Sequence, residues 1–191
     1  VHMYERMGFV DRGMADSSWG GESWHEMVLR LQEFRGMRRF RQALSRQECI
    51  EILRQEPRGV LSVLGEHGYP YGMPLDHWYC EENGRLYFHG SRRTGHRYDA
   101  LMACDKVSYC VYDEGYRREG EWALNIRSVI VFGRMRIVED EARALEICRR
   151  LAEKYTDDES YITHELEHAG PRVQVLELVP EHMSGKLVNE S

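Results

Sequence analysis

The chain has 191 residues, of which 42% are hydrophobic and 30% are charged, a composition typical of a soluble globular protein with one sizeable core. Its net charge of -6 and its pI near 5.9 argue against a nucleic-acid binder, which usually carries a basic surface. No apolar run approaches the roughly 18 residues that a membrane-spanning helix needs. Residues 1–12 also lack the apolar segment of a signal peptide, so we expect a cytoplasmic protein.

The cysteines predict neither a disulfide framework nor a zinc finger. Their number, five, is odd, and no two of them form a CxxC pair. We expect reduced thiols that act as small buried apolar side chains. They are Cys49, Cys80, Cys104, Cys110 and Cys148.

Residues 1–36 differ from the rest of the chain and are interpreted as an N-terminal extension, with the domain proper at 37–191. Apolar residues in 24–34 recur at helical spacing, which predicts one short amphipathic helix. Three alternatives stay open for the extension: a docking helix, a disordered tail, or an upstream addition set by the choice of start codon. We expect a mobile extension with one helix.

The first helix of the domain is predicted by a capping box, with Ser45 at the N-cap and Glu48 at N3. Pro57 and Gly59 end it soon after Gln55. Further helices are expected at 95–103, 140–155 and 161–168.

Runs of β-forming residues predict the strands, and Asn83-Gly84 marks a hairpin. Gly133 suggests a bend in the longest strand. Short connections between strands argue against a doubly wound parallel sheet. We therefore predict a mainly β, antiparallel six-stranded barrel with flanking helices. The expected strands are 59–64, 70–79, 85–89, 106–112, 122–138 and 172–179.

A candidate phosphate site lies in residues 87–97 (YFHGSRRTGHR), where a strand leads through a polar loop into a helix. Ser91 and Thr94 offer hydroxyls, and the helix start offers free amides and a positive dipole end. Arg97 can bind a phosphate through two parallel hydrogen bonds. The alternative is a solvated basic loop.

Residues 69–76 (YPYGMPLD) contain two prolines, which cannot donate to a β-ladder. This predicts an edge or bulged strand with unpaired backbone groups. A flat polar heterocycle could bind such groups, whereas the alternative is a plain irregular edge strand.

Residues 37–188 resemble the pyridoxamine 5′-phosphate oxidase-like FMN-binding split-barrel proteins, and within that family they are most similar to the nitroimidazole-resistance (Nim-type) subgroup. The order and spacing of the segments carry the resemblance. They are MRRFRQALS, GVLSV, GYPYGMPL, GRLYFHGSRRTGHRYDAL, KVSYCV, RSVIVFGRMRIVED, LAEKYT, PRVQVLEL and EHMSGK.

The resemblance implies a split barrel that binds FMN at a homodimer interface. It assigns the phosphate to His89, Ser91, His96 and Arg97, and the isoalloxazine edge to Met73, Pro74, Leu75 and Asp76. Ser62 and Ser128 are additional candidates. Because His96 replaces a fixed cation, FMN affinity should weaken as pH rises through neutrality.

His77 follows the predicted flavin-edge segment and admits two interpretations. It is either a structural histidine held by hydrogen bonds or a residue that faces a substrate. No catalytic residue is assigned, because the flavin carries the chemistry.

His164-Glu165-Leu166-Glu167-His168 matches the HExxH pattern of zinc proteases. A catalytic zinc site also needs a third ligand and an open position. Gly170-Pro171 ends the helix directly afterwards, and the surrounding segment is strongly polar. We therefore interpret the segment as a solvated charged helix and expect no metal site.

The function that the resemblance implies is reduction of a small planar acceptor by flavin, with nitroaromatic compounds as candidate substrates and NAD(P)H as a candidate electron donor. The alternative is a non-catalytic flavin carrier or sensor, or a haem-binding relative on the same barrel. Oxidation of pyridoxamine phosphate is disfavoured, because the family's extended substrate-binding C-terminus is not evident.

Overall fold

The computed structural model describes residues 4, 9–14, 24–29, 34–91, 95–170 and 173–189. The chain forms two compact units, Val1–Gly36 and Met37–Ser191. In the first unit, β1 (Phe9–Met14) pairs antiparallel with β2 (His25–Leu29).

The helix expected over residues 24–34 is wrong where it overlaps β2. Met27 pairs with Asp11 and Val28 with Val10, so the β-ladder to β1 satisfies this backbone. In so short a stretch, apolar spacing alone does not separate a helix from a strand. Residues 30–33 lie outside the described residues.

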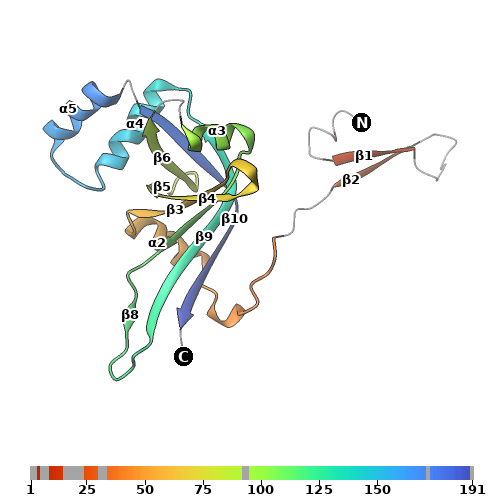
Figure 1. Cartoon of the computed structure of the whole chain (residues 1–191), viewed down its shortest axis with the longest axis horizontal. Coiled ribbons are helices and arrows are strands. Elements are labelled where there is room, and N and C mark those ends of the chain that lie inside the picture. Colours follow the sequence, from red (N-terminus) through yellow and green to blue (C-terminus); the bar gives the residue numbers. More distant parts are fainter. Residues whose placement is uncertain are drawn as a thin grey trace. The chain divides into compact units, whose positions relative to one another are not determined.

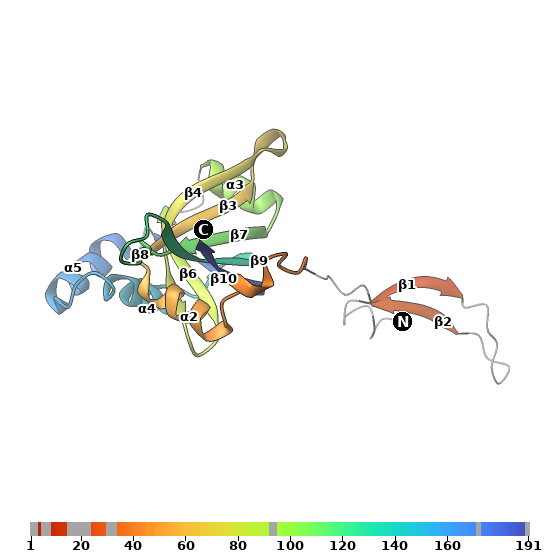
Figure 2. The same cartoon turned by 90° about the horizontal axis from the view of Figure 1, so that it is seen from below.

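The second unit is built on one eight-stranded antiparallel sheet with the order β4-β3-β7-β9-β10-β6-β5, and β8 pairs with β9 off this path. Figures 1 and 2 show the sheet curling around the core as a half-barrel. This confirms the predicted mainly β split barrel, but the single strand expected over residues 70–79 is divided into two strands at opposite ends of the order, and β8 is additional. The strands are β3 (Arg58–Leu64), β4 (Pro70–Asp76), β5 (Trp78–Cys80), β6 (Arg85–Ser91), β7 (Lys106–Tyr112), β8 (Tyr116–Arg117), β9 (Leu124–Ile137) and β10 (Val173–Asn189).

Four α-helices flank the sheet within the described ranges: α2 (Arg46–Gln55), α3 (His96–Ala103), α4 (Glu141–Ala152) and α5 (Glu159–Ala169). Short 3-10 turns are η1 (Phe40–Gln42) and η2 (Glu66–Gly68). The predicted capping box is confirmed, because the Ser45 hydroxyl accepts from the Glu48 amide while the Glu48 carboxylate accepts from the Ser45 amide. Every described helix is too short or too polar to cross a membrane.

The core fills the concave side of the sheet and is closed by α2. Tyr109, Phe88 and Leu61 are fully buried at its centre, and Ile52 and Leu53 of α2 pack against them. A second apolar cluster lies where α4 packs on β5, β6 and β10. Its buried members are Cys80, Tyr87, Ile147, Leu151 and Val175.

Strand β10 continues to Asn189, well past the predicted end at 179. A bulge absorbs Pro180: its register partner is Gly133, whereas His182 already pairs with Phe132, which leaves Glu181 extra. The irregularity expected at Gly133 therefore lies on the opposite strand. Gly133 itself is required because a Cβ would collide with the Val179 carbonyl oxygen.

Candidate functional site

The residues of the predicted phosphate site meet where β6 ends and α3 begins. On β6, Leu86 and Phe88 point into the core, so Gly90 lies on the same inner face. The guanidinium of Arg97, from the first turn of α3, fills the space that a side chain at position 90 would occupy. We call Gly90, Arg97 and the start of α3 the phosphate corner.

Arg97 is half-buried, and this burial lowers the pKa of its guanidinium, partly offset by the nearby Tyr71. In the part of the chain that the structure describes, Arg97 makes no ion pair and no hydrogen bond. A guanidinium that is partly desolvated without an anion is unfavourable. An anionic ligand would relieve that cost.

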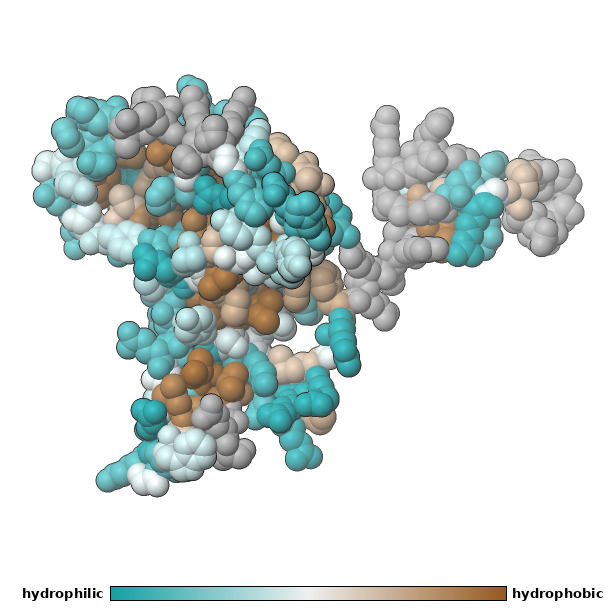
Figure 3. Space-filling model, in the orientation of Figure 1, coloured by the Kyte–Doolittle hydropathy of each residue, from teal (hydrophilic) through white to brown (hydrophobic). Residues whose placement is uncertain are grey.

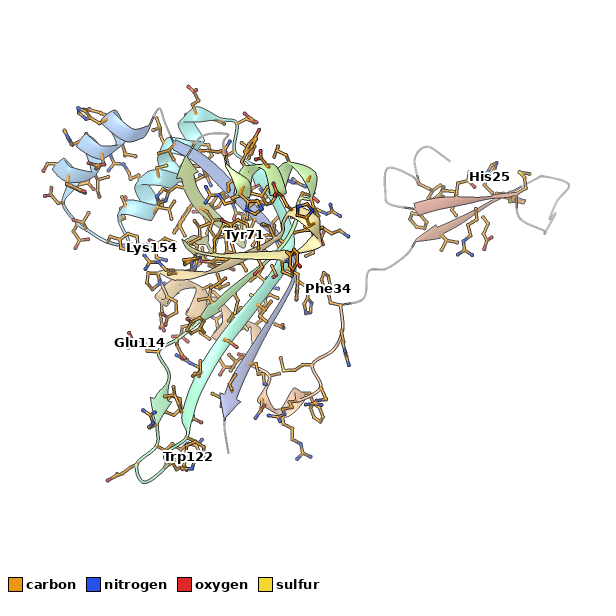
Figure 4. All side chains as sticks on the ribbon, viewed as in Figure 1. His25, Phe34, Tyr71, Glu114, Trp122 and Lys154 are labelled. Carbon is orange, nitrogen blue, oxygen red and sulfur yellow. The ribbon has the colours of Figure 1, made fainter. Side chains whose placement is uncertain are left out.

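The start of α3 adds to the positive field at this corner. Gly95 is the N-cap, with φ of 93°, and among the described residues no side chain caps the helix. The first amides of α3 are therefore available to an anion, as at other helix starts. The His96 ring stacks on Tyr71 of β4, with centroids 4.2 Å apart and planes 8° apart. Tyr71 is labelled in Figure 4, beside α3.

β4 ends the strand order, which confirms the edge strand predicted from its two prolines. Met73 and Leu75 are partly buried against the core, while Pro74 is exposed on the other face. Asp76 accepts hydrogen bonds from Arg58, at 2.5 Å from Nε and 3.2 Å from Nη2. Burial is the largest single influence and raises the pKa of Asp76, but the hydrogen bonds from Arg58 and Tyr155 and the nearby positive charges together outweigh it, so the net pKa shift is downward.

His77 is fully buried behind the predicted flavin edge. Its Nε2 donates to the Leu53 carbonyl at 2.7 Å, and its Nδ1 lies 2.9 Å from the Tyr109 hydroxyl. That hydroxyl donates to the Leu75 carbonyl at 2.6 Å. Burial lowers the pKa of His77 to about 4. This geometry agrees with a structural histidine and not with one that faces a substrate.

Ser62 and Ser128 lie on the outer face of the sheet, opposite the core. Ser62 pairs in register with Ser108 on β7, and Ser128 pairs with Tyr112. The Ser128 hydroxyl is 3.5 Å from the Lys186 carbonyl. These serines are therefore separated by the sheet from the inner residues Met73 and Leu75.

The structure thus divides the predicted site residues. His96 and Arg97 lie together at the phosphate corner, whereas His89 is exposed on the face of β6 away from Gly90. His89 instead interacts electrostatically with Asp76. The side chain of Ser91, and all of Thr94, lie outside the described residues.

Gly90 and Tyr71 were not predicted to contribute to the site. A glycine within a strand often marks a close approach, so Gly90 carried a usable signal. Tyr71 carried none, because its stacking on His96 depends on tertiary packing.

The HExxH segment lies on α5, as predicted, with the His164 and His168 ring centroids 4.0 Å apart. The His168 Nδ1 is hydrogen-bonded to the His164 carbonyl at 2.8 Å. Both histidines are exposed. Among the described residues no group of three or more His, Cys, Asp or Glu side chains is arranged to hold a metal ion.

A family model described as pyridoxamine 5′-phosphate oxidase matches residues 45–187. The chain belongs to the pyridoxamine 5′-phosphate oxidase family. No curated protein sequence matches the chain.

Solved structures of this family's fold resemble the chain at low sequence identity. A candidate 5-nitroimidazole antibiotic resistance protein from Bacteroides thetaiotaomicron has a TM-score of 0.65 and 18% identity, covering 77% of this chain and 87% of its own. An FAD-binding protein from Mesorhizobium loti has a TM-score of 0.54 and 22% sequence identity, and the match covers 76% of this chain and 96% of that protein. A flavocytochrome from Azotobacter vinelandii has a TM-score of 0.59 and 22% sequence identity, and the match covers 80% of this chain and 72% of that protein. At these identities the similarities establish the fold.

Proposed function

We propose that this chain binds FMN, with the phosphate held at the phosphate corner. The observation that carries the proposal is the half-buried Arg97, which has no anionic partner in the described part of the chain. A phosphomonoester dianion matches one guanidinium in bidentate geometry together with the free amides at the start of α3. The residues present therefore fit the group that the family implies.

Family membership supports a flavin, and so does the description of one similar structure as an FAD-binding protein. The isoalloxazine would lie along β4, whose edge backbone at residues 73–76 can hydrogen-bond a flat heterocycle. Because Asp76 is already paired with Arg58, its carboxylate is fixed in place. The Leu75 carbonyl already accepts a hydrogen bond from the Tyr109 hydroxyl, so the other backbone groups of residues 73–76 would bind the isoalloxazine.

A homodimer is part of the proposal, because the outer face of the sheet leaves apolar side chains uncovered. Ile130 is 37% exposed on this face of β9, and Leu64 and Tyr112 are more exposed on β3 and β7. Figure 3 shows apolar surface on the body of this unit. A two-fold partner would bury such a face. Ser62 and Ser128 would then lie close to the partner protomer.

We propose that the flavin-loaded protein reduces a small planar acceptor, with nitroaromatic compounds as the candidate class and NAD(P)H as the electron donor. When bound, the flavin supplies hydride transfer. Arg97 would anchor the cofactor, β4 would orient its ring, and the apolar interface would exclude water. No side chain of the site is assigned as a general acid or base.

A spectrum of the purified protein tests the proposal, followed by anaerobic addition of NADPH and then a 5-nitroimidazole. The expected result is flavin absorbance that bleaches with NADPH and returns with the nitro compound. A bound flavin that no nicotinamide donor reduces would favour a carrier and contradict the enzyme. A Soret band without flavin would favour haem and contradict the cofactor assignment.

A further inference from the structure

A cavity lies away from the phosphate corner, among α4, α5 and the adjoining ends of β9 and β10. Its volume is about 340 Å³, near the lower end of the range for small-molecule sites. Figure 1 places α4 and α5 together on one side of the sheet. The residues that matter for its chemistry are Val138, Ala144, Leu145, Cys148, Leu166 and Gln174.

The walls of this cavity are mostly apolar. Val138, Ala144 and Cys148 are partly buried and pack against the second apolar cluster. Leu166 of α5 lines the opposite side. Apolar walls that are accessible to solvent favour a ligand whose apolar surface would cover them.

One polar side chain distinguishes this cavity from a packing defect. Gln174 of β10 lines it and is only 8% exposed. Among the described residues, the Gln174 amide has no hydrogen-bond partner. Its amide atoms are not among the fully buried, unpaired side-chain atoms of the described residues, so they are accessible to a ligand in the cavity, and a complementary amide or carbonyl group could hydrogen-bond them.

The lining also sets the charge of the ligand. The charged lining residues within the described ranges are Glu139, Glu141 and Glu167, and none is Lys, Arg or His. A phosphate or carboxylate would face these three carboxylates, and no described lining residue is a cation. Anionic ligands are therefore expected at Arg97 and not in this cavity.

We propose that this cavity binds a compact, uncharged organic molecule with an amide or carbonyl edge, held by the Gln174 side chain between α4 and α5. The site is separate from flavin binding, and it stands whether or not the chain takes FMN.

Benzamide is a suitable probe, since it is compact, neutral and carries an amide. The full chain is alkylated with iodoacetamide with and without benzamide, and each cysteine is quantified by peptide mass spectrometry. Burial raises the pKa of the Cys148 thiol, so the reaction is run at alkaline pH. Benzamide is expected to slow labelling of Cys148, which lines the cavity, and to leave Cys110 on β7 unchanged.

The role of Gln174 is tested by calorimetry with benzamide and toluene. Gln174→Leu should weaken benzamide binding about fivefold or more, the value of one neutral hydrogen bond. The same substitution should not weaken the binding of toluene, which has no polar group. The exposed Gln47→Leu on α2 is the matched control and should change neither.

Protection of Cys148 in the wild-type chain keeps the test valid if Gln174→Leu does not fold. Equal labelling of Cys148 at millimolar benzamide would overturn the proposal. So would benzamide binding that Gln174→Leu leaves unchanged. Both measurements are repeated with FMN present, so a failure of flavin binding is scored separately from a failure of this site.

Discussion

The guanidinium of Arg97 lies against the α-carbon of Gly90, in the space where any other residue at position 90 would place its side chain. This contact joins the end of β6 to the first turn of α3. It holds a cation at the inner face of the sheet, where nothing in the described part of the chain neutralises it. The glycine and the arginine therefore act as one unit.

Gly90→Ala should displace Arg97 and weaken FMN binding by about tenfold or more, because the charge-assisted contacts to phosphate lose their geometry. Titration of FMN, followed by flavin fluorescence, measures the change. Gly36→Ala is the matched control, since a Cβ there meets nothing within 4 Å. Unchanged FMN affinity in Gly90→Ala would separate Arg97 from the cofactor.

Buried His77 should make stability depend on pH. The unfolded chain protonates this residue near pH 6.5, whereas the folded chain does so only near a pKa of about 4. Between these values the unfolded state holds more protons, so the free energy of unfolding falls as pH falls, by roughly 3 kcal/mol in total.

Urea unfolding at a series of pH values measures this dependence. His77→Gln should flatten the fall between pH 6.5 and 4, and His164→Gln, on the exposed face of α5, should not. The same slope in His77→Gln and in the wild type would show that another group is responsible.

Tyr109→Phe should lower the free energy of unfolding by about 1–3 kcal/mol, because it leaves buried polar groups without their partner. The lost hydroxyl donates to the Leu75 carbonyl and faces the His77 imidazole. Denaturant titration measures the cost. The exposed Tyr161→Phe on α5 serves as control, and a loss no greater than in this control would contradict the proposed network.

Ile130→Glu should convert the proposed homodimer into a monomer, because it places a charge on the apolar outer face of β9. Light scattering after size-exclusion chromatography gives the mass, and FMN retention should fall with it. Tyr161→Glu, an equally non-conservative change on α5, should leave both unchanged. A dimer that persists in Ile130→Glu would move the interface elsewhere.

Local signals in the sequence predicted local structure well. The capping box at Ser45 is present because its partner is three residues away, and Gly84 takes the φ of 68° that the β5–β6 hairpin requires. The end of β10 was missed because Pro180 normally stops a strand, whereas here a bulge at Glu181 carries the ladder onward.

The site was predicted less completely, because its geometry depends on contacts between distant elements. Residue type marked Arg97 as a candidate anion ligand, but only the register of β6 and the position of α3 place its guanidinium against Gly90. Side chains alternate along β4, so Met73 points toward the core and Pro74 points away from it. The segment predicted to contact the flavin edge therefore has side chains on both faces of the sheet. His77 could be assigned to the core only once Leu53 was placed beside it.

The dissociation constant for FMN, compared between Arg97→Ala and Arg136→Ala, tests the central claim most directly. Arg136 is an exposed arginine on β9 and controls for the loss of one positive charge. Binding should weaken by about tenfold to a hundredfold in Arg97→Ala and stay at the wild-type value in Arg136→Ala. Equal affinity in both variants, or a wild-type protein that does not take up FMN, would contradict the account.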